Sequence, residues 1–228
     1  MRAFKISAAL FAGLIFSNAI AGAADLDTEI TNNVDVIKQA AEEAGYLELS
    51  PEDIEKLLDA SHLGDYEKST LRALEKYIDM SNATFDYGAA SADNAVDQKI
   101  VRDYAIGLKS SGWELVGTGG GISDIETKAQ QLRSEFNTPG TCGGVNGYQF
   151  NPPAILIDSC IINAAEHSES LDVGFAGPAG ILTHKAGIGP TAAGAITAIL
   201  ASESAAARSC NATGNGIRVF ADGRCESQ

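Results

Sequence analysis

Positive charge is scarce in this chain of 228 residues, because 16 lysines and arginines face 30 aspartates and glutamates and leave a formal net charge of −14. This charge excludes electrostatic binding to nucleic-acid phosphates as the main activity, so we expect no nucleic acid as partner. It also argues against a protein held on anionic lipid by basic residues. Cysteine is scarce too, and four residues are too few for a disulfide-dense scaffold.

Motifs typical of catalysis are missing from the sequence. It has no G-x-S-x-G, no H-E-x-x-H, no C-x-x-C and no aspartic-protease Asp-Thr-Gly or Asp-Ser-Gly. We expect no cofactor. Whether the protein is an enzyme stays open, since catalytic residues recruited from distant segments need no local motif.

One segment resembles a set of metal ligands, with Glu166, His167, Glu169 and Asp172 close together and His184 further along. Zinc needs about three protein ligands that converge, and neighbours on one segment rarely do so. A solvated polar loop is therefore the favoured interpretation and no metal site is expected. His167, Glu169 and His184 are the candidate ligands if a metal is bound.

The glycine run at 117–121 lies between an expected strand at 113–116 and an expected helix at 123–136. A strand, a glycine loop and a helix in this order present backbone N–H groups to a phosphate, which makes Gly119, Gly120 and Gly121 candidates for phosphate binding. The loop lacks the spacing of the dinucleotide fingerprint and the Lys-Ser/Thr ending of the P-loop. A structural turn is therefore favoured, and no phosphate site is expected.

The first 24 residues are typical of a cleavable secretory signal peptide. Arg2 and Lys5 give a positive start, a charge-free run follows over residues 6–22, and small residues precede Asp25. The run is too short and too diluted to favour an uncleaved anchor helix. We therefore expect a secreted or periplasmic location, no stable membrane span, and cysteines paired as disulfides.

Composition changes part-way along the chain. Residues 25–109 hold 19 acids, 8 bases and no cysteine, whereas residues 110–228 hold 11 acids, 6 bases and all four cysteines, and most glycines lie after residue 106. We expect an acidic helical region at 25–109 and a disulfide-containing α+β region at 110–228. One domain or two would fit this change, and a loose two-part architecture is favoured.

Apolar residues recur at spacings of three and four along the first region, which predicts about four short helices. The first covers residues 26–41, and the second begins at Ser50-Pro51 and ends before Gly64. The third is lined by Leu71, Leu74, Tyr77 and Ile78, and the fourth runs from about residue 93 to 109. Such helices are typical of a bundle or of hairpins.

The second region is expected to be a glycine-rich, disulfide-stapled α/β part, which makes the whole an α+β fold. Residues 154–157 and 161–162 are buried strand or helix, and residues 216–221 form a final strand. Cys142, Cys160, Cys210 and Cys225 allow three pairings. The local scheme, Cys142 with Cys160 and Cys210 with Cys225, is slightly favoured because it closes two short loops.

The segment at 173–207 is rich in alanine and glycine, with no charge from Ala186 to Ser202. It predicts a helix from Pro190 to about Arg208 that packs closely in the core. The alternative is a membrane-active helix of a secreted toxin. Its four strongly apolar residues contribute only about −2 kcal/mol on the insertion scale, which favours the core.

These features favour a secreted or periplasmic binding or interaction protein, whose partner is an unknown extracellular or periplasmic protein or a small molecule. The alternatives are an extracytoplasmic hydrolase with dispersed catalytic residues and the membrane-active toxin. Two sequons, at Asn82 and Asn211, are close to what chance supplies, so glycosylation and the kind of host stay open.

Signal-peptide cleavage is directly testable. We expect N-terminal mass spectrometry of the secreted protein to find a first residue between Gly22 and Asp25, and a mature charge of −16 because 14 basic residues then face 30 acidic ones. An intact Met1 in the exported protein would overturn the assignment.

Overall fold

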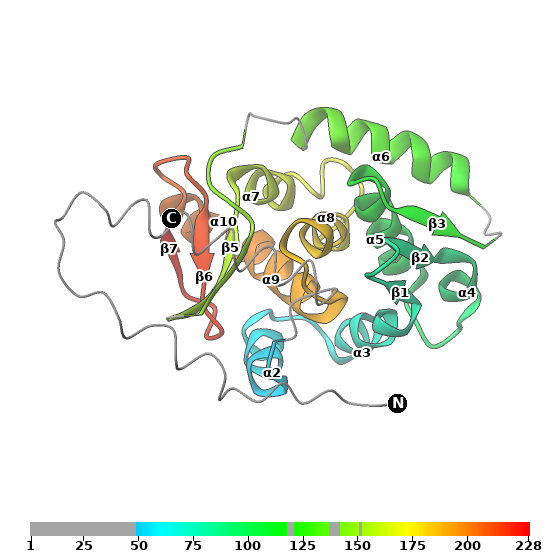
Figure 1. Cartoon of the computed structure of the whole chain (residues 1–228), viewed down its shortest axis with the longest axis horizontal. Helices are drawn as coiled ribbons and strands as arrows, with labels where there is room; N and C mark the ends of the chain where they lie inside the picture. Colours follow the sequence, from blue (N-terminus) through cyan, green and yellow to red (C-terminus); the bar gives the residue numbers. More distant parts are fainter. Residues whose placement is uncertain (1–48, 118–120, 137–141, 151) are drawn as a thin grey trace, which may run out of the picture. The chain divides into compact units, whose positions relative to one another are not determined.

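Helices α8 (Ala176–Ala186) and α9 (Pro190–Ser202) form the centre of the fold. The computed structural model describes residues 49–117, 121–136, 142–150 and 152–228, all within one compact unit that covers residues 37–228. Gly187 ends α8 in the left-handed conformation, at φ 64°, and lets the chain turn into α9. Figure 1 places the other described elements around this pair.

Both central helices are buried almost all round, because their side chains are small or aliphatic and carry almost no charge. A helix that is apolar on every face needs neighbours on every side. The prediction that segment 173–207 packs in the core is confirmed for most of residues 173–200, whereas Ser202, Glu203, Ala205 and Ala206 are exposed. No helix among the described residues is long and apolar enough to cross a membrane.

Helices from both composition regions cover this centre. They are α2 (Pro51–Ala60), α3 (Asp65–Leu74), α4 (Tyr87–Ala92), α5 (Gln98–Ser110), α6 (Ile122–Phe136), α7 (Ser159–Glu166) and α10 (Ser204–Cys210). Helices α2, α3, α7 and α10 pack on α9, α5 and α7 pack on α8, and α6 packs on α5 and α7. The buried residues of both regions belong to one hydrophobic cluster.

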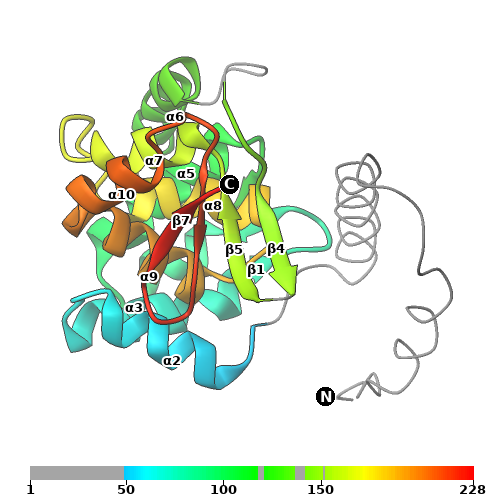
Figure 2. The ribbon, with the colours of Figure 1, turned by 90° about the vertical axis from the view of Figure 1, so that its left-hand side faces the viewer.

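Two small sheets flank the helices. The first has β1 (Ile78–Asp79) antiparallel and β3 (Glu114–Val116) parallel to β2 (Thr84–Asp86). The second is antiparallel throughout, in the order β4 (Gly147–Phe150), β5 (Pro153–Ile157), β6 (Ile217–Val219) and β7 (Cys225–Ser227). Figure 2 shows the second sheet from its outer side, with the helices behind it.

A mixed α+β fold with two small sheets and two disulfides therefore agrees with the sequence analysis. The bridges follow the local scheme, Cys142 with Cys160 and Cys210 with Cys225. The signal segment and the helix expected at 26–41 lie outside the described residues.

The predicted end of the third helix and the predicted start of the fourth helix were wrong. The third stops at Leu74, and after a 3-10 turn at Glu75–Tyr77 the chain enters β1, because Ile78 pairs with Phe85 across the sheet. The fourth begins only at Gln98, since the carboxylate of Asp97 accepts the first free backbone N–H groups and caps the helix there.

The final expected helix is two helices. At Glu203 the backbone leaves helical geometry, with φ −109° and ψ 38°, so α9 ends at Ser202 and α10 is separate. Residues 161–162 lie in α7 and residues 154–157 in β5, which settles two segments that the sequence left between strand and helix. Strand β7 was not expected.

Glycine allows α5 and α8 to approach to backbone contact. A Cβ added at Gly107 would overlap the carbonyl oxygen of Gly177, and one at Gly180 would overlap the carbonyl of Tyr104 and the amide of Leu108. Side chains at these positions would force the two helices apart. This pair has the most extensive contact between helices in the described part of the chain.

The close contact predicts a large effect of a single methyl group. We expect Gly107→Ala to lower the free energy of unfolding in urea by about 1–3 kcal/mol, because the helices must shift to relieve the overlap. Gly64→Ala is the control, since a Cβ there meets only a Glu67 carboxylate oxygen at 3.5 Å and should cost less than about 1 kcal/mol. Equal losses in both variants would contradict this packing.

Candidate functional site

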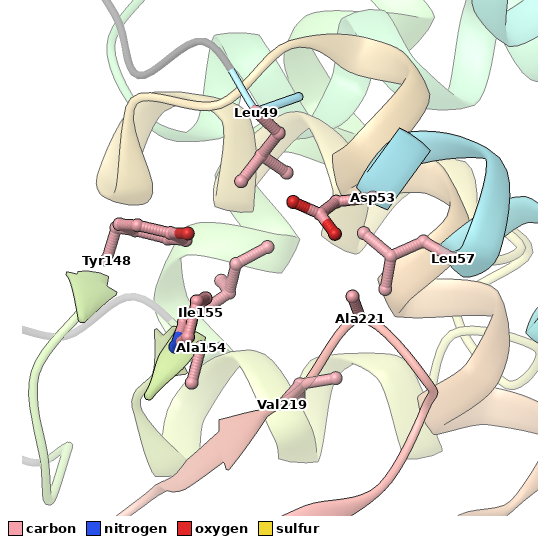
Figure 3. A pocket seen from close by; sticks show the side chains of 9 residues that line it. Leu49, Asp53, Leu57, Tyr148, Ala154, Ile155, Val219 and Ala221 are labelled. Atoms are coloured by element: carbon pink, nitrogen blue, oxygen red, sulfur yellow. The ribbon is translucent and has the colours of Figure 1, made fainter. Parts of the chain in front are cut away.

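A pocket opens between the first turn of α2 and the inner face of the second sheet (Figure 3). Its enclosed part is only about 20 Å³, and the space including the open mouth is about 250 Å³. Seven of the nine lining residues are apolar, and the two polar ones are Asp53 and Tyr148. The apolar lining consists of Leu49, Leu57, Pro153, Ala154, Ile155, Val219 and Ala221.

The helix side of the pocket is set by the cap of α2. Ser50 precedes Pro51, and its hydroxyl accepts the backbone N–H of Asp53 at 3.1 Å. The same hydroxyl donates to the Asp53 carboxylate at 2.7 Å, which holds that side chain in the first turn, where the helix dipole favours a negative charge. Leu57, one turn further along the same face, is buried beneath it.

The sheet side of the pocket is a row of three cross-strand neighbours. Tyr148 on β4 is in register with Ile155 on β5, which is in register with Val219 on β6. Residues directly opposite in an antiparallel sheet point to the same face. Ile155 and Val219 are buried, and the half-buried Tyr148 stands at the end of the row.

Asp53 and Tyr148 bring polar chemistry into this apolar site from opposite walls. In Figure 3 the Tyr148 hydroxyl points across the pocket toward the Asp53 carboxylate. Burial, and next the negative charge of Asp53, raise the pKa of the Tyr148 phenol, so this phenol stays neutral and its oxygen can accept a hydrogen bond from a cation.

The nearest described cation does not fully neutralise Asp53. Lys56 lies 3.8 Å from the carboxylate but only 2.8 Å from Glu52, on the outer face of α2. The pocket can therefore accept the positive charge of a ligand whose apolar part rests on the sheet.

Neither polar residue stands out in the sequence alone. An acid such as Asp53 is ordinary in the first turn of a helix, where the dipole favours a negative charge, and Tyr148 belongs to no motif. The cap sequence Ser50-Pro51 placed the carboxylate at a helix start, but nothing local connects it with a tyrosine on a distant strand.

The candidate metal ligands do not converge. His167 and Glu169 are exposed at the end of α7, where His167 Nδ1 lies 2.8 Å from the carbonyl oxygen of Asn163, and His184 lies on α8. In the described part of the chain, the only group of three potential ligands within 4.8 Å of one another is Cys142, Asp158 and Cys160. Both sulfurs of that group are in a disulfide.

The candidate phosphate loop is only partly visible, because Gly119 and Gly120 lie outside the described residues. Gly121 precedes α6 with a left-handed φ of 89°, and its carbonyl accepts the N–H groups of Asp124 and Ile125. These contacts belong to a structural helix start.

His184 has a structural partner in the buried Trp113. The indole Nε1 donates to His184 Nδ1 at 2.8 Å, so the neutral ring carries its proton on Nε2. Although much of its surface is exposed, desolvation of the ring, and next the charge of Lys185, lower the pKa of His184. Protonation of Nδ1 would leave the indole N–H without its acceptor.

This pair predicts a loss of stability in mild acid. Because the folded pKa lies below the ordinary value, the unfolded chain binds more protons, and stability should fall as the pH drops below about 6.5. Urea unfolding of His184→Gln, whose amide oxygen still accepts from Trp113, should show a weaker pH dependence between pH 7 and 5. His167→Gln is the control for loss of an exposed imidazole, and an identical change in both variants would contradict the role of His184.

Comparisons with known proteins assign neither a family nor a function to this chain. Protein-family models, curated proteins and solved structures give no match to the chain. The chemistry of the pocket is therefore the basis for a function.

Proposed function

We propose that the protein is an extracytoplasmic binding protein whose pocket takes a small ligand with one cationic group on an apolar body. The observation that carries this proposal is the Asp53 carboxylate facing Tyr148 above an apolar floor. An ammonium group would bond to the carboxylate and the phenol oxygen, and its alkyl or aromatic part would cover Ile155 and Val219.

The size of the pocket limits what can enter it. Its enclosed part is only about 20 Å³, far below the about 300–1,000 Å³ that sites for drug-sized molecules usually enclose. The cationic group alone would therefore enter between Asp53 and Tyr148, and the single ring or short alkyl chain that carries it would rest in the open mouth. The net charge of −14 would raise the local concentration of such cations.

The two disulfides support a location outside the cytoplasm, where such bridges form and persist. The signal-like sequence at 1–24 agrees with this location and lies outside the described residues. A binding role also agrees with the positions of the three histidines, none of which lines the pocket.

Binding of a matched set of ligands tests the proposal. We expect NMR titration to give phenylethylammonium a dissociation constant in the range of about 1 mM, as suits a ligand of this size. The neutral phenylethanol and the anionic phenylpropionate should bind more weakly. The shifted resonances should belong to α2 and to β4, β5 and β6.

Variants separate the pocket from the overall charge. Asp53→Asn should weaken phenylethylammonium binding at least about tenfold, because it removes the charged acceptor and keeps the shape. Asp59→Asn, on the exposed face of the same helix, changes the net charge equally and should leave binding unchanged. Equal binding of the amine and the alcohol, or equal effects of the two variants, would overturn the proposal.

A further inference from the structure

The sequence contains two Asn-Gly pairs, Asn146-Gly147 and Asn215-Gly216. An asparagine before glycine is prone to deamidation, because glycine has no side chain to keep its backbone nitrogen away from the asparagine carboxamide. The reaction needs a carboxamide that is free to turn and a backbone nitrogen that can attack it. The two pairs differ in both respects in the folded protein.

The Asn146 carboxamide is held at both of its polar atoms. Its Nδ2 donates to the Asp158 carboxylate at 2.6 Å, and its Oδ1 accepts from the Asp158 backbone N–H at 2.9 Å. The Asp158 carboxylate is buried and lies 3.4 Å from the Lys185 ammonium. Turning the carboxamide toward the Gly147 nitrogen would break both bonds and take a donor from a buried charge, which is strongly unfavourable.

The Asn215 side chain is exposed in the turn between α10 and β6. Among the described residues, the Thr213 hydroxyl accepts the Asn215 backbone N–H at 3.4 Å, and none bonds to the carboxamide. The carboxamide can therefore turn without breaking a hydrogen bond. Its glycine neighbours, Gly214 and Gly216, have left-handed φ angles of 73° and 80°. Exposed turns of this kind open locally at low cost in free energy.

One hydrogen bond restrains the attacking nitrogen at this second pair. The Gly216 N–H donates to Asn211 Oδ1 at 2.9 Å, which opposes loss of the N–H proton. Gly216 is packed against the Ile157 carbonyl, so the exposed carboxamide is the part that moves. A single bond between neutral groups is a weaker restraint than the two bonds that join Asn146 to Asp158.

We propose that Asn215 is the first site of spontaneous deamidation in the folded protein, that Asn211 slows the reaction there, and that Asn146 is protected. The Gly216 nitrogen attacks Asn215 Cγ and forms a C–N bond that closes a succinimide ring. The bond from Cγ to Nδ2 breaks, and Nδ2 leaves as ammonia with the proton that the Gly216 nitrogen has lost. Water then opens the ring and leaves aspartate or isoaspartate. This proposal does not depend on the pocket or its ligand.

The position of the turn gives the reaction a structural consequence. Gly143 and Gly144 pack closely on the turn, since an added Cβ would overlap the carbonyl oxygen of Gly214 at the first and of Asn215 at the second. The same two glycines lead into Asn146 and β4. Isoaspartate carries one more carbon in the backbone, and both products add a negative charge. Conversion at Asn215 therefore alters the packing beside the start of β4.

Storage of the native full chain in mildly alkaline buffer, followed by peptide mass spectrometry, tests the order of reaction. We expect Asn215 to be converted at least about tenfold faster than Asn146. In concentrated urea both restraints are lost, and the two pairs should react at rates within about threefold of each other. Equal rates in the native protein, faster conversion of Asn146, or a preference of the same size in urea would each overturn the proposal.

Two variants test the role of Asn211. Asn211→Ala removes the acceptor of the Gly216 N–H and should speed conversion of Asn215 by about threefold or more, with no change at Asn146. Asn211→Asp keeps an acceptor oxygen and should keep the slow rate. An unchanged rate at Asn215 in Asn211→Ala would show that Asn211 does not slow the reaction. Equal acceleration at Asn146 would show a general loosening of the fold, and this outcome too would contradict the role of the bond.

Discussion

The backbone contact between α5 and α8 is the constraint on which the rest of the packing depends. Gly107 and Gly180 let the two helices approach until backbone atoms touch, so no side chain separates them there. Dispersion and close packing are strongest at such distances. With α8 fixed against α5, its remaining surface faces α9, α7 and strands β4 and β5.

Helix α9 fills the space beside α8, and a residue from another element completes its start. Its own N-cap is Gly189, which has no side chain to offer, and Glu75 supplies the missing acceptor by taking hydrogen bonds from the N–H and the hydroxyl of Thr191 at 3.0 and 2.8 Å. A Cβ at Gly189 would overlap that carboxylate. The acidic first region thus satisfies the start of an uncharged helix of the second region, and the buried residues of both regions belong to one core.

Local chemistry made part of this fold predictable. The cap at Ser50-Pro51, strands β3 and β6, the local disulfide pairing and the burial of most of segment 173–207 each follow from signals close together in the sequence. The end of α3 was misplaced because strand pairing decides it, and the start of α5 because Asp97, rather than Asp93, caps the helix. Ile78 fits helical spacing with Leu71 and Leu74, yet pairing with Phe85 draws it into a sheet. The break at Glu203 has no glycine or proline to mark it.

The candidate site could not be predicted from the sequence, because its two polar groups come together only in the tertiary structure. Tyr148 stands opposite Asp53 because β4 keeps its register, and that register is held at its beginning. Asn146 bonds to Asp158 through both side-chain atoms, and the Gln228 amide bridges Val145, Ile157 and Ile217 by accepting from the Val145 N–H and donating to the three carbonyls.

The Cys142–Cys160 disulfide lies beside these contacts. Cys142 shortly precedes Asn146 in the chain, and the Asp158 carboxylate lies within 4.8 Å of both sulfurs. A one-residue slip of β4 would turn Tyr148 to the other face of the sheet and remove it from the pocket. The polar bonds around Asn146 and Gln228 oppose such a slip. The geometry of the pocket therefore depends on hydrogen bonds made outside it, at the start of β4 and at the end of the chain.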